Sequence, residues 1–539
     1  MRFAAVSLLA LSLTSAAWAD TPAKPAPQAT TEVSFAISCA PPVQKDFRHA
    51  VWLLHSFWYP EADKAFAAVA AAEPGCAMAY WGIAMSHWYP LWYPPGPEAL
   101  KADSEAVAKA EAAKPKTDRE RDYIAAIVAF YRDSDKLDHA TRAKAYEKAM
   151  EQVYLRYPED NEAAAFYALA LNATASPNDK TFANKKKAAE ILNKVWAEEP
   201  NHPGVVHYLI HSDDVPQFAQ AGLDAAICYS KIAPEVPHAL HMPSHIFTRL
   251  GLWRQSIDSN RAAHDAALGY ARKTLGPNGF DGETLHPMDY LEYAYLQLGE
   301  DGAAKRVVDE LATFRDGAPP NPPMAYAVAA IPVRYALERQ DWKAAASLAP
   351  IAPVPLDKFP WAAAMISFGR ALGAAHTGDT AGAETEIAKL QTLEDGLNAA
   401  KNSYWANQVK VQRLDASAVL AEAKGDKQKA LELAREAADL DATMDKNPVT
   451  PSPVLPAREM LADMLLAAND PKAALAEYGK ALHSDPNRFR SLAGEARAAR
   501  QAGDAAAAKQ AYQKLATLAH ADTAAPRPEF VEAKAYLAN

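Results

Sequence analysis

The sequence is poor in cysteine and lacks the short motifs of the common enzyme classes. Its 539 residues hold three cysteines, Cys39, Cys76 and Cys228. None belongs to a Cys-x-x-Cys pair, which excludes a thioredoxin-type redox motif. A Gly-x-Ser-x-Gly elbow, a phosphate-binding Gly-rich loop and a His-Glu-x-x-His phrase are also missing. Catalysis without a metal is therefore hard to build from this chain.

Basic residues are in the minority. Lysine and arginine number 56 against 66 aspartates and glutamates, a formal net charge of −10. A nucleic-acid partner requires a basic stripe, and so does an anionic lipid surface. We therefore expect no nucleic-acid partner.

Long apolar runs are missing after the first residues. Met1 and Arg2 precede an apolar run, Phe3 to Leu13, and the small-x-small phrase 17–19 follows. This pattern predicts a secretory signal peptide over residues 1–19, cut between Ala19 and Asp20. Because no later stretch is long enough to span a bilayer, we expect no membrane insertion. The predicted location is the periplasm or the extracellular medium.

The rest of the chain indicates an all-α protein. Residues 20–38 are rich in Thr, Pro and Ala and are predicted to be a flexible linker. From Val43 onward the chain is alanine-rich with helical periodicity, and no alternating run resembles a strand. Two stretches 34 residues apart share the same spacing of residue types, Asp470, Ala474 and Tyr478 in one and Asp504, Ala508 and Tyr512 in the other.

This spacing resembles the tetratricopeptide repeat. A small residue, an aromatic four later and a proline eight after that recur near both ends, as Ala62, Phe66 and Pro74 and as Ala474, Tyr478 and Pro486. The resemblance implies an all-α, tetratricopeptide-type solenoid of helical hairpins in a right-handed superhelix. Stacking is needed because one hairpin cannot bury its apolar face alone. We expect an N-terminal lobe at 39–316, a C-terminal lobe at 324–520 and a tail at 521–539.

Three phrases suggest a closer relationship. Pro448 to Pro451, Pro486 to Arg490 and the His-Met-Pro-Ser-His phrase at 241–245 resemble those of a family of exported bacterial repeat proteins. That resemblance names a scaffold and no chemistry.

The repeat positions of two cysteines predict a disulfide. Cys39 lies four residues before Val43, and Cys76 immediately precedes Ala77; both residues take the first position of a repeat helix. The starts of neighbouring first helices lie side by side, so Cys39 and Cys76 are expected to pair in an oxidising compartment. Cys228 lies outside the pair and is expected to be buried. The alternative is that all three are small buried hydrophobic residues.

The histidines are clustered. Six of the fifteen fall between residues 202 and 245, where random placement would put about one. His207 and His211 form an i,i+4 pair, as do His241 and His245, and such a pair shares one helix face. The two pairs are 34 residues apart, which is one repeat. They therefore take equivalent places on adjacent hairpins.

The repeat resemblance assigns these residues to the concave groove. All-imidazole ligation suits copper, zinc or iron rather than calcium or magnesium. We therefore predict a transition-metal site in the groove, with a ligand count that matches a coupled dinuclear copper site if the histidines divide three and three. The candidate ligands are His202, His207 and His211 on one side and His238, His241 and His245 on the other.

Other residues are assigned to the same face. Asp214 and Asp289 are expected to accept the free ring N–H of a ligand, and Arg249 to balance them or to hold an anionic substrate. His286 falls under His238 in a less regular alignment. The expected aromatic wall of the groove consists of Trp81, Met85, Trp88 and Tyr89, with His55 beside them.

Two functions remain open at this stage. One is an exported metal-dependent redox enzyme. The other is a non-catalytic scaffold that binds a peptide or protein partner in the groove. A third interpretation of the histidines is that they are hydrogen-bonded structural residues.

Overall fold

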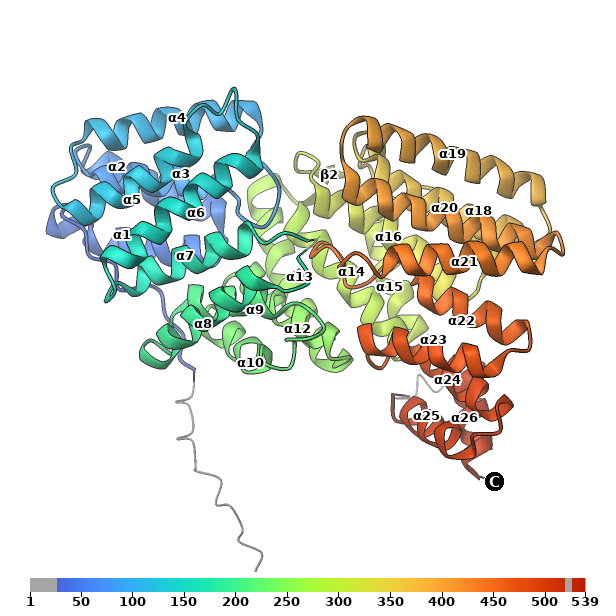
Figure 1. The fold of residues 1–539 in the computed structure, drawn as a ribbon. Coiled ribbons are helices and arrows are strands. Elements are labelled where there is room, and N and C mark those ends of the chain that lie inside the picture. The colour runs from blue at the N-terminus through green and yellow to red at the C-terminus, as the bar shows by residue number, and fades with distance from the viewer. Residues whose placement is uncertain (1–26, 178, 519–525, 539) are drawn as a thin grey trace, which may run out of the picture.

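The computed structural model describes residues 27–177, 179–518 and 526–538, and this part of the chain is almost entirely helical (Figure 1). The predicted signal peptide, 1–19, and residues 20–26 of the predicted linker lie outside the described residues. No helix among the described residues combines the length and hydropathy needed to cross a membrane.

The N-terminal helices follow one another as antiparallel pairs, in which each helix packs against the next. They are α1 (Pro41–His55), α2 (Tyr59–Ala72), α3 (Ala77–Ser86), α4 (Pro97–Ala112), α5 (Asp118–Tyr131), α6 (His139–Arg156), α7 (Asn161–Ala173), α8 (Ala183–Glu198), α9 (Pro203–Asp213), α10 (Leu223–Ile232), α11 (Pro237–His241) and α12 (Pro243–Arg249).

The second half continues in the same manner after a longer helix. It comprises α13 (Trp253–Leu275), β1 (Gly279–Phe280), α14 (Gly282–Gln297), α15 (Asp301–Leu311), β2 (Asp316–Gly317), α16 (Pro322–Glu338), α17 (Trp342–Ala346), the 3-10 helix η1 (Leu356–Lys358), α18 (Pro360–His376), α19 (Thr380–Ala399), α20 (Ser403–Ala423), α21 (Lys427–Asp441), α22 (Ala457–Ala467), α23 (Pro471–Ser484), α24 (Phe489–Gln501), α25 (Ala505–Leu518) and α26 (Pro528–Ala538). The short strands β1 and β2 pair in parallel.

The repeat residues explain why these helices pair closely. In the first hairpins, a Cβ added to Gly82 would lie 2.2 Å from the ring of Phe66, so the aromatic of one helix packs directly on the backbone of the next. Sixteen residues likewise separate Tyr478 from Gly494, where an added Cβ would lie 2.1 Å from the tyrosine ring. The same contact at both ends of the chain confirms the predicted solenoid of helical hairpins.

The recurring Asp-x-x-x-Ala step starts the second helix of several hairpins. Each aspartate caps its helix by accepting a hydrogen bond from the backbone N–H three residues later, and each alanine is buried against the partner helix. The steps with both features are Asp341 and Ala345, Asp379 and Ala383, Asp426 and Ala430, and Asp470 and Ala474.

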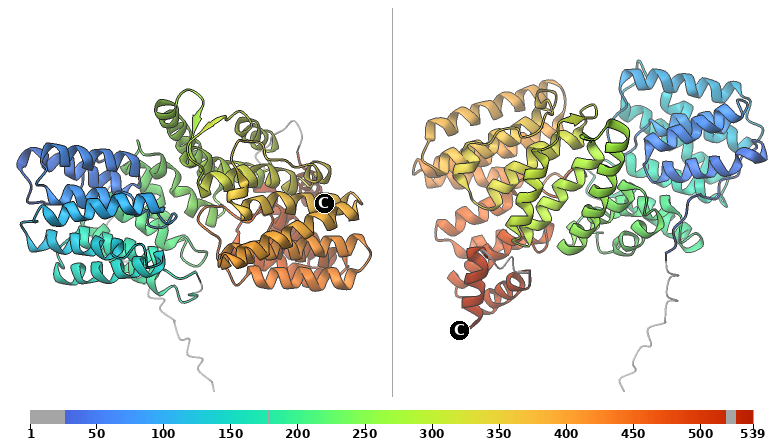
Figure 2. Two further views of the ribbon diagram at one scale, coloured as in Figure 1. Left: turned by 90° about the horizontal axis from the view of Figure 1, so that it is seen from above. Right: turned by 180° about the vertical axis from the view of Figure 1, so that it is seen from behind.

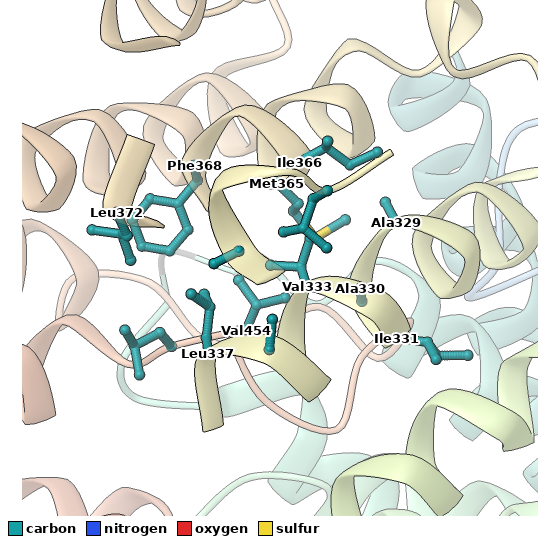
Figure 3. Packing of buried hydrophobic residues seen from close by; sticks show 14 of the residues in the cluster. Ala329, Ala330, Ile331, Val333, Leu337, Met365, Ile366, Phe368, Leu372 and Val454 are labelled. Atoms are coloured by element: carbon teal, nitrogen blue, oxygen red, sulfur yellow. The ribbon is translucent and has the colours of Figure 1, made fainter. Parts of the chain in front are cut away.

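The buried hydrophobic residues form two main clusters, and these do not meet at residues 317–323, the expected boundary between the lobes. One cluster of buried residues ends at Phe247, and the next begins at Trp253 and continues through α16 and α18, where Val333, Phe368 and Val454 are in the same core (Figure 3). The prolines at 322–323 occupy the first turn of α16, a position that tolerates proline.

Both expected irregular segments contribute to packing. Phe35, in the expected linker, is 1% exposed and contacts the rings of Phe47, Trp81 and Tyr123. The expected tail contains α26, whose Phe530 packs on Phe489 at a ring distance of 4.9 Å. In both cases one large aromatic side chain fixes a segment whose composition alone resembles a linker.

The predicted disulfide is confirmed. Cys39 and Cys76 are bonded, with Cα atoms 5.3 Å apart, and join the starts of the first and third helices. Cys228 in α10 is half-buried rather than buried.

The two halves also touch through segments far apart in sequence. The loop between α21 and α22, residues 442–456, leaves the C-terminal block and reaches α9, α12 and α14 (Figures 1 and 2). The α23–α24 connection also meets the middle of the chain, where Trp253 Nε1 donates to the carbonyl oxygen of Asn487 at 3.0 Å.

Candidate metal centre

Six buried histidines gather in the middle of the solenoid as two sets of three. In each set, one nitrogen from every ring lies within 4.8 Å of the others. Helix α9 supplies two of the rings, α11 two, and α12 and α14 one each. The first set is His207, His211 and His238, and the second set is His241, His245 and His286.

The first set has too few acceptor lone pairs for hydrogen bonds alone to explain its contacts. Nδ1 of His207 lies 2.7 Å from the carbonyl oxygen of His55, so it carries the proton and donates it there. Nε2 of the neutral ring then has one lone pair. That atom lies 3.1 Å from Nε2 of His211 and also 3.1 Å from Nε2 of His238. One lone pair accepts one hydrogen bond well, so the second contact is unexplained.

A metal ion accounts for both contacts. Imidazole nitrogens bind zinc at roughly 2.0–2.1 Å, and two nitrogens at that radius and 3.1 Å apart subtend about 98° at the ion. This lies between octahedral and tetrahedral geometry.

The second set makes the same point more strongly. Nδ1 of His241 donates to Oδ1 of Asn260 at 2.6 Å, and Nδ1 of His245 donates to Oδ2 of Asp214 at 2.9 Å. The Asn260 amide is oriented because its Nδ2 donates to the Ser256 carbonyl at 2.7 Å. Both Nε2 atoms are therefore unprotonated in the neutral rings, yet they face each other at 3.0 Å. Two lone pairs this close repel each other unless a proton or a metal ion lies between them.

The acceptor of His245 is strongly ionised. Burial acts to raise the pKa of Asp214, but Lys446, Arg249 and His245 hold it well below the ordinary value. Arg249 Nε donates to Asp214 at 2.8 Å, and Lys446 Nζ lies 3.6 Å away. Arg249 also pairs with Asp445. Asp214 thus fixes the orientation of one candidate ligand, and Arg249 balances carboxylates.

The six rings are ready to bind metal without losing protons. Burial lowers the pKa of every one of them, that of His207 and that of His286 to about 3. Metal ligation requires neutral imidazole, so protons compete little at neutral pH.

His202 lies in a different cluster from the one expected. It is the N-cap of α9, where its Nδ1 accepts the Val205 N–H at 3.3 Å and its Nε2 donates to Glu162 at 3.2 Å. His55 donates Nε2–H to the same carboxylate at 2.7 Å and accepts from the Tyr208 hydroxyl. Burial acts to raise the pKa of Glu162, but the two histidines lower it to about 2.

Every ring nitrogen of that cluster has a partner, so it is a closed hydrogen-bond network. The sixth histidine of the candidate centre is His286 and not His202. Its ring centroid lies 4.4 Å from that of His241. The expected division of 202/207/211 against 238/241/245 is therefore replaced by the two sets above.

Two further expectations differ from the structure. Asp289 pairs with Arg334, 0% exposed, and contacts no ring of the two sets.

Trp81, Met85 and Trp88 are core residues because the helices after α3 cover them. Trp81 packs on Phe166 of α7, and Met85 accepts from the Tyr146 hydroxyl of α6. Tyr89 of the expected wall does line a cavity, together with Trp92 and Tyr93.

A cavity of about 300 Å³ opens onto the centre. It is lined by imidazoles of both sets, His211, His238, His245 and His286, by Met242, by Leu91, Trp92, Tyr93 and Pro94, by Pro322, Pro323, Trp361, Asn402 and Trp405, and by Asn447, Pro448 and Val449. Sequence reasoning assigned none of the lining residues that follow His286 in the chain to the site. For the last three, the signals were a proline-rich break without helical periodicity and the phrase from Pro448 to Pro451.

Comparisons with known proteins give no family. No protein-family model and no curated protein matches the chain. Among solved structures, it is similar to the P58(IPK) TPR domain at 12% identity, covering 92% of this chain and 98% of that one with a TM-score of 0.21. It is also similar to yeast Tom70 at 13%, covering 92% and 94% with a TM-score of 0.27, and to the APC/C hetero-tetramer Cut9–Hcn1 at 14%, covering 91% and 95% with a TM-score of 0.26. The solenoid assignment rests on the hairpin packing described above.

Proposed function

We propose that the chain is an exported metalloprotein in which the six histidines bind a pair of transition-metal ions, and that it is a redox enzyme for a small molecule. The observation that carries the proposal is the pair of lone pairs in the second set. His241 and His245 have both Nδ1 protons committed elsewhere while their Nε2 atoms face each other at 3.0 Å.

The two sets are close enough to act together. Rings of different sets approach with centroids 6.3 Å apart for His238 and His241 and 6.4 Å for His211 and His245. Each set offers three converging nitrogens of its own, so the arrangement favours two ions rather than one. A close pair of redox-active ions supplies two-electron chemistry when bound.

The donor set favours copper. All six donors are neutral imidazoles, which suit copper, zinc, iron and nickel, and nitrogen sites bind copper most tightly among the divalent ions. Met242, 0% exposed and lining the cavity, is compatible with copper. Zinc and iron are the other candidates.

The protein's own groups have defined tasks in this proposal. The His55 carbonyl, Asn260 and Asp214 each hold one ligand ring in the tautomer that leaves Nε2 free. The 447–449 segment closes one side of the cavity and limits water there. The leader-like residues 1–19 support export.

Elemental analysis of the protein purified from its natural compartment tests the proposal. Two equivalents of copper, or of zinc or iron, per chain are expected. His207→Ala should lower the content of the first set and His286→Ala that of the second, each by about one equivalent.

His264→Ala is the matched control. His264 is also a buried histidine, but its nitrogens bond to the Thr284 carbonyl and to Glu310, outside the two sets. It should retain both equivalents. Metal-free wild-type protein, or full metal content in both ligand variants, would overturn the proposal. Unfolding of both variants with no metal in the parent would establish the histidines as core residues.

A second candidate is a non-catalytic scaffold that binds a peptide. Its support is a larger cavity of about 710 Å³ between the two halves, lined by Tyr404, Trp405, Arg249, Asp441 and Lys480 among others. Charged and aromatic residues together suit an extended peptide. Absence of metal in the native protein would favour this function.

A further inference from the structure

We propose that the cavity beside the histidines binds a neutral, flat aromatic molecule of one or two rings. The assignment of that molecule as the substrate rests on the proposed redox function. The binding itself rests on the cavity alone.

Aromatic side chains from three parts of the chain line the cavity. Trp92 lies against the His238 ring with centroids 5.2 Å apart. Trp361 of α18 and Trp405 of α20 also line the cavity and stack on each other, with centroids 4.3 Å apart and planes 14° from parallel. Offset stacking on such faces stabilises an aromatic guest beyond the area it buries. A flat ring is therefore favoured over a saturated one of the same size.

The lining carries no formally charged side chain. Its polar side chains are the four histidines, Tyr93 and two amides, Asn402 and Asn447. The nearby Arg249 and Asp214 are paired with each other. In the chain without metal, a charged guest would lose its hydration without gaining an ion pair, which disfavours its binding. The amides offer hydrogen bonds to a hydroxyl or similar edge group.

The volume limits the guest. About 300 Å³ lies at the lower end of the roughly 300–1,000 Å³ found for small-molecule sites. One or two fused rings fit this size. Because His211, His238, His245 and His286 form part of the wall, an edge of the guest would lie next to the ions.

The cavity is distinct from its neighbour. A second cavity of about 290 Å³ shares Trp92, Tyr93 and His238 but is otherwise lined by Trp58, Tyr59, Asp281 and Glu283. Its two carboxyl groups distinguish its lining from that of the first cavity. Trp58 belongs to that cavity only, and Trp405 is absent from it.

Isothermal titration calorimetry with three matched probes tests the inference on the full mature chain, with its metal content measured in parallel. The probes are 2-naphthol, 2-naphthoate and decahydro-2-naphthol. For the chain freed of metal by a chelator, we expect 2-naphthol to bind at least tenfold more tightly than the charged 2-naphthoate and at least fivefold more tightly than the saturated alcohol.

Variants locate the site. Trp92→Leu and Trp405→Leu should each weaken 2-naphthol binding at least tenfold, while Trp58→Leu should change it less than twofold. Circular dichroism checks that each variant is folded. Trp92 lies in the α3–α4 connection and Trp405 in α20, so a folding defect in one variant leaves the other as a test. Equal binding of the three probes, no binding of 2-naphthol, or unchanged binding in both Trp92→Leu and Trp405→Leu would overturn the inference.

The two proposals fail separately. Binding of 2-naphthol to a chain that carries no metal as purified would sustain the aromatic site and remove the redox function. Two metal equivalents without 2-naphthol binding would sustain the metal centre and remove the aromatic site.

Discussion

The carbonyl oxygen of His55, at the end of α1, accepts a hydrogen bond of 2.7 Å from Nδ1 of His207 in the middle of α9. The two residues are 152 positions apart. This bond decides which nitrogen of His207 faces the other rings. His55 is itself fixed by Glu162 and by the Tyr208 hydroxyl, so the first hairpin orients a candidate ligand from the ninth helix.

Gly204→Ala should disturb this arrangement. An added Cβ would lie 2.4 Å from Nδ1 of His55 and 2.8 Å from its Cγ, and the buried ring has no free direction in which to move. We expect the free energy of unfolding to fall by about 1–3 kcal/mol, as for other overpacked sites. The amount of metal bound by the first set should fall together with the stability, and elemental analysis measures it.

Gly269→Ala is the control for this change. Gly269 lies in α13, and nothing comes within 4 Å of a Cβ built there. The substitution should leave metal content unchanged and stabilise the helix by up to about 1 kcal/mol. A Gly204→Ala protein with unaltered stability and metal content would show that the close contact is relieved at no cost.

Asp214→Asn should affect the second set selectively. The change removes the anion that holds His245 and leaves Arg249 and Lys446 without their shared carboxylate. Loss of such a supporting group typically costs about 10–100-fold in metal affinity. Titration with a competing chelator should show one weakened and one unchanged ion.

The neighbouring Asp213→Asn serves as the comparison. Burial raises the pKa of Asp213 to about 7, so it is partly neutral already at that pH. It should keep both ions at wild-type affinity. Equal weakening in the two variants would assign the effect to the helix and not to the Asp214 hydrogen bond.

Metal-free protein should lose stability on acidification. The folded pKa of His207 and of His286 is about 3, below the unfolded value of 6.5, because burial disfavours the charged ring. Unfolding therefore takes up protons below pH 6.5, and this stability is lost progressively as pH falls toward 3. From pH 7 to 5 each ring should account for about 2 kcal/mol.

The midpoint of thermal unfolding, followed by circular dichroism from pH 7 to pH 5, measures this effect. His207→Gln removes one of the titrating rings and should flatten the dependence. The contribution of His202 to the pH dependence of stability has the opposite sign. Burial acts to lower the pKa of His202, but Glu162 raises it above the ordinary value. An unchanged slope in His207→Gln would contradict the assignment.

Opening the disulfide should loosen the first hairpins. Cys39 and Cys76 are separated by 37 positions, and closing a loop of that size stabilises the fold by about 4 kcal/mol in the chain-entropy model. Cys76→Ser should therefore lower the thermal midpoint and increase proteolysis near α1. Cys228→Ser, outside the bond, should change the midpoint little.

The regular part of the centre was predictable from sequence. His207 and His211 recur as His241 and His245 after one repeat, and a solenoid places equivalent residues of adjacent hairpins side by side. Their helical spacing required no knowledge of the loops. The three-membered sets nevertheless could not be derived, because the sixth ring lies 48 positions after His238.

That interval is irregular because of the long helix α13 and strand β1. His202 was misassigned for a local reason, since an N-cap residue has extended backbone and its ring turned toward Glu162 of α7. Trp81 and Trp88 lie at groove positions of the repeat, but the expected linker and helix α6 cover them. Sequence periodicity contains no information about which segment covers a face.

The contact of Gly251 with the α23–α24 connection affects how the molecule unfolds. Gly251 has a φ of +64°, and an added Cβ would lie 2.3 Å from the Pro486 carbonyl oxygen, while its own carbonyl accepts from Asn487. An open repeat array frays from its ends, one unit at a time. Here a late segment is bound to the middle of the chain, and Lys446 and Tyr290 add a second connection. Shortening the chain before residue 442 would therefore remove support from hairpins two hundred positions earlier, and the histidines would lose their order when the C-terminal block does.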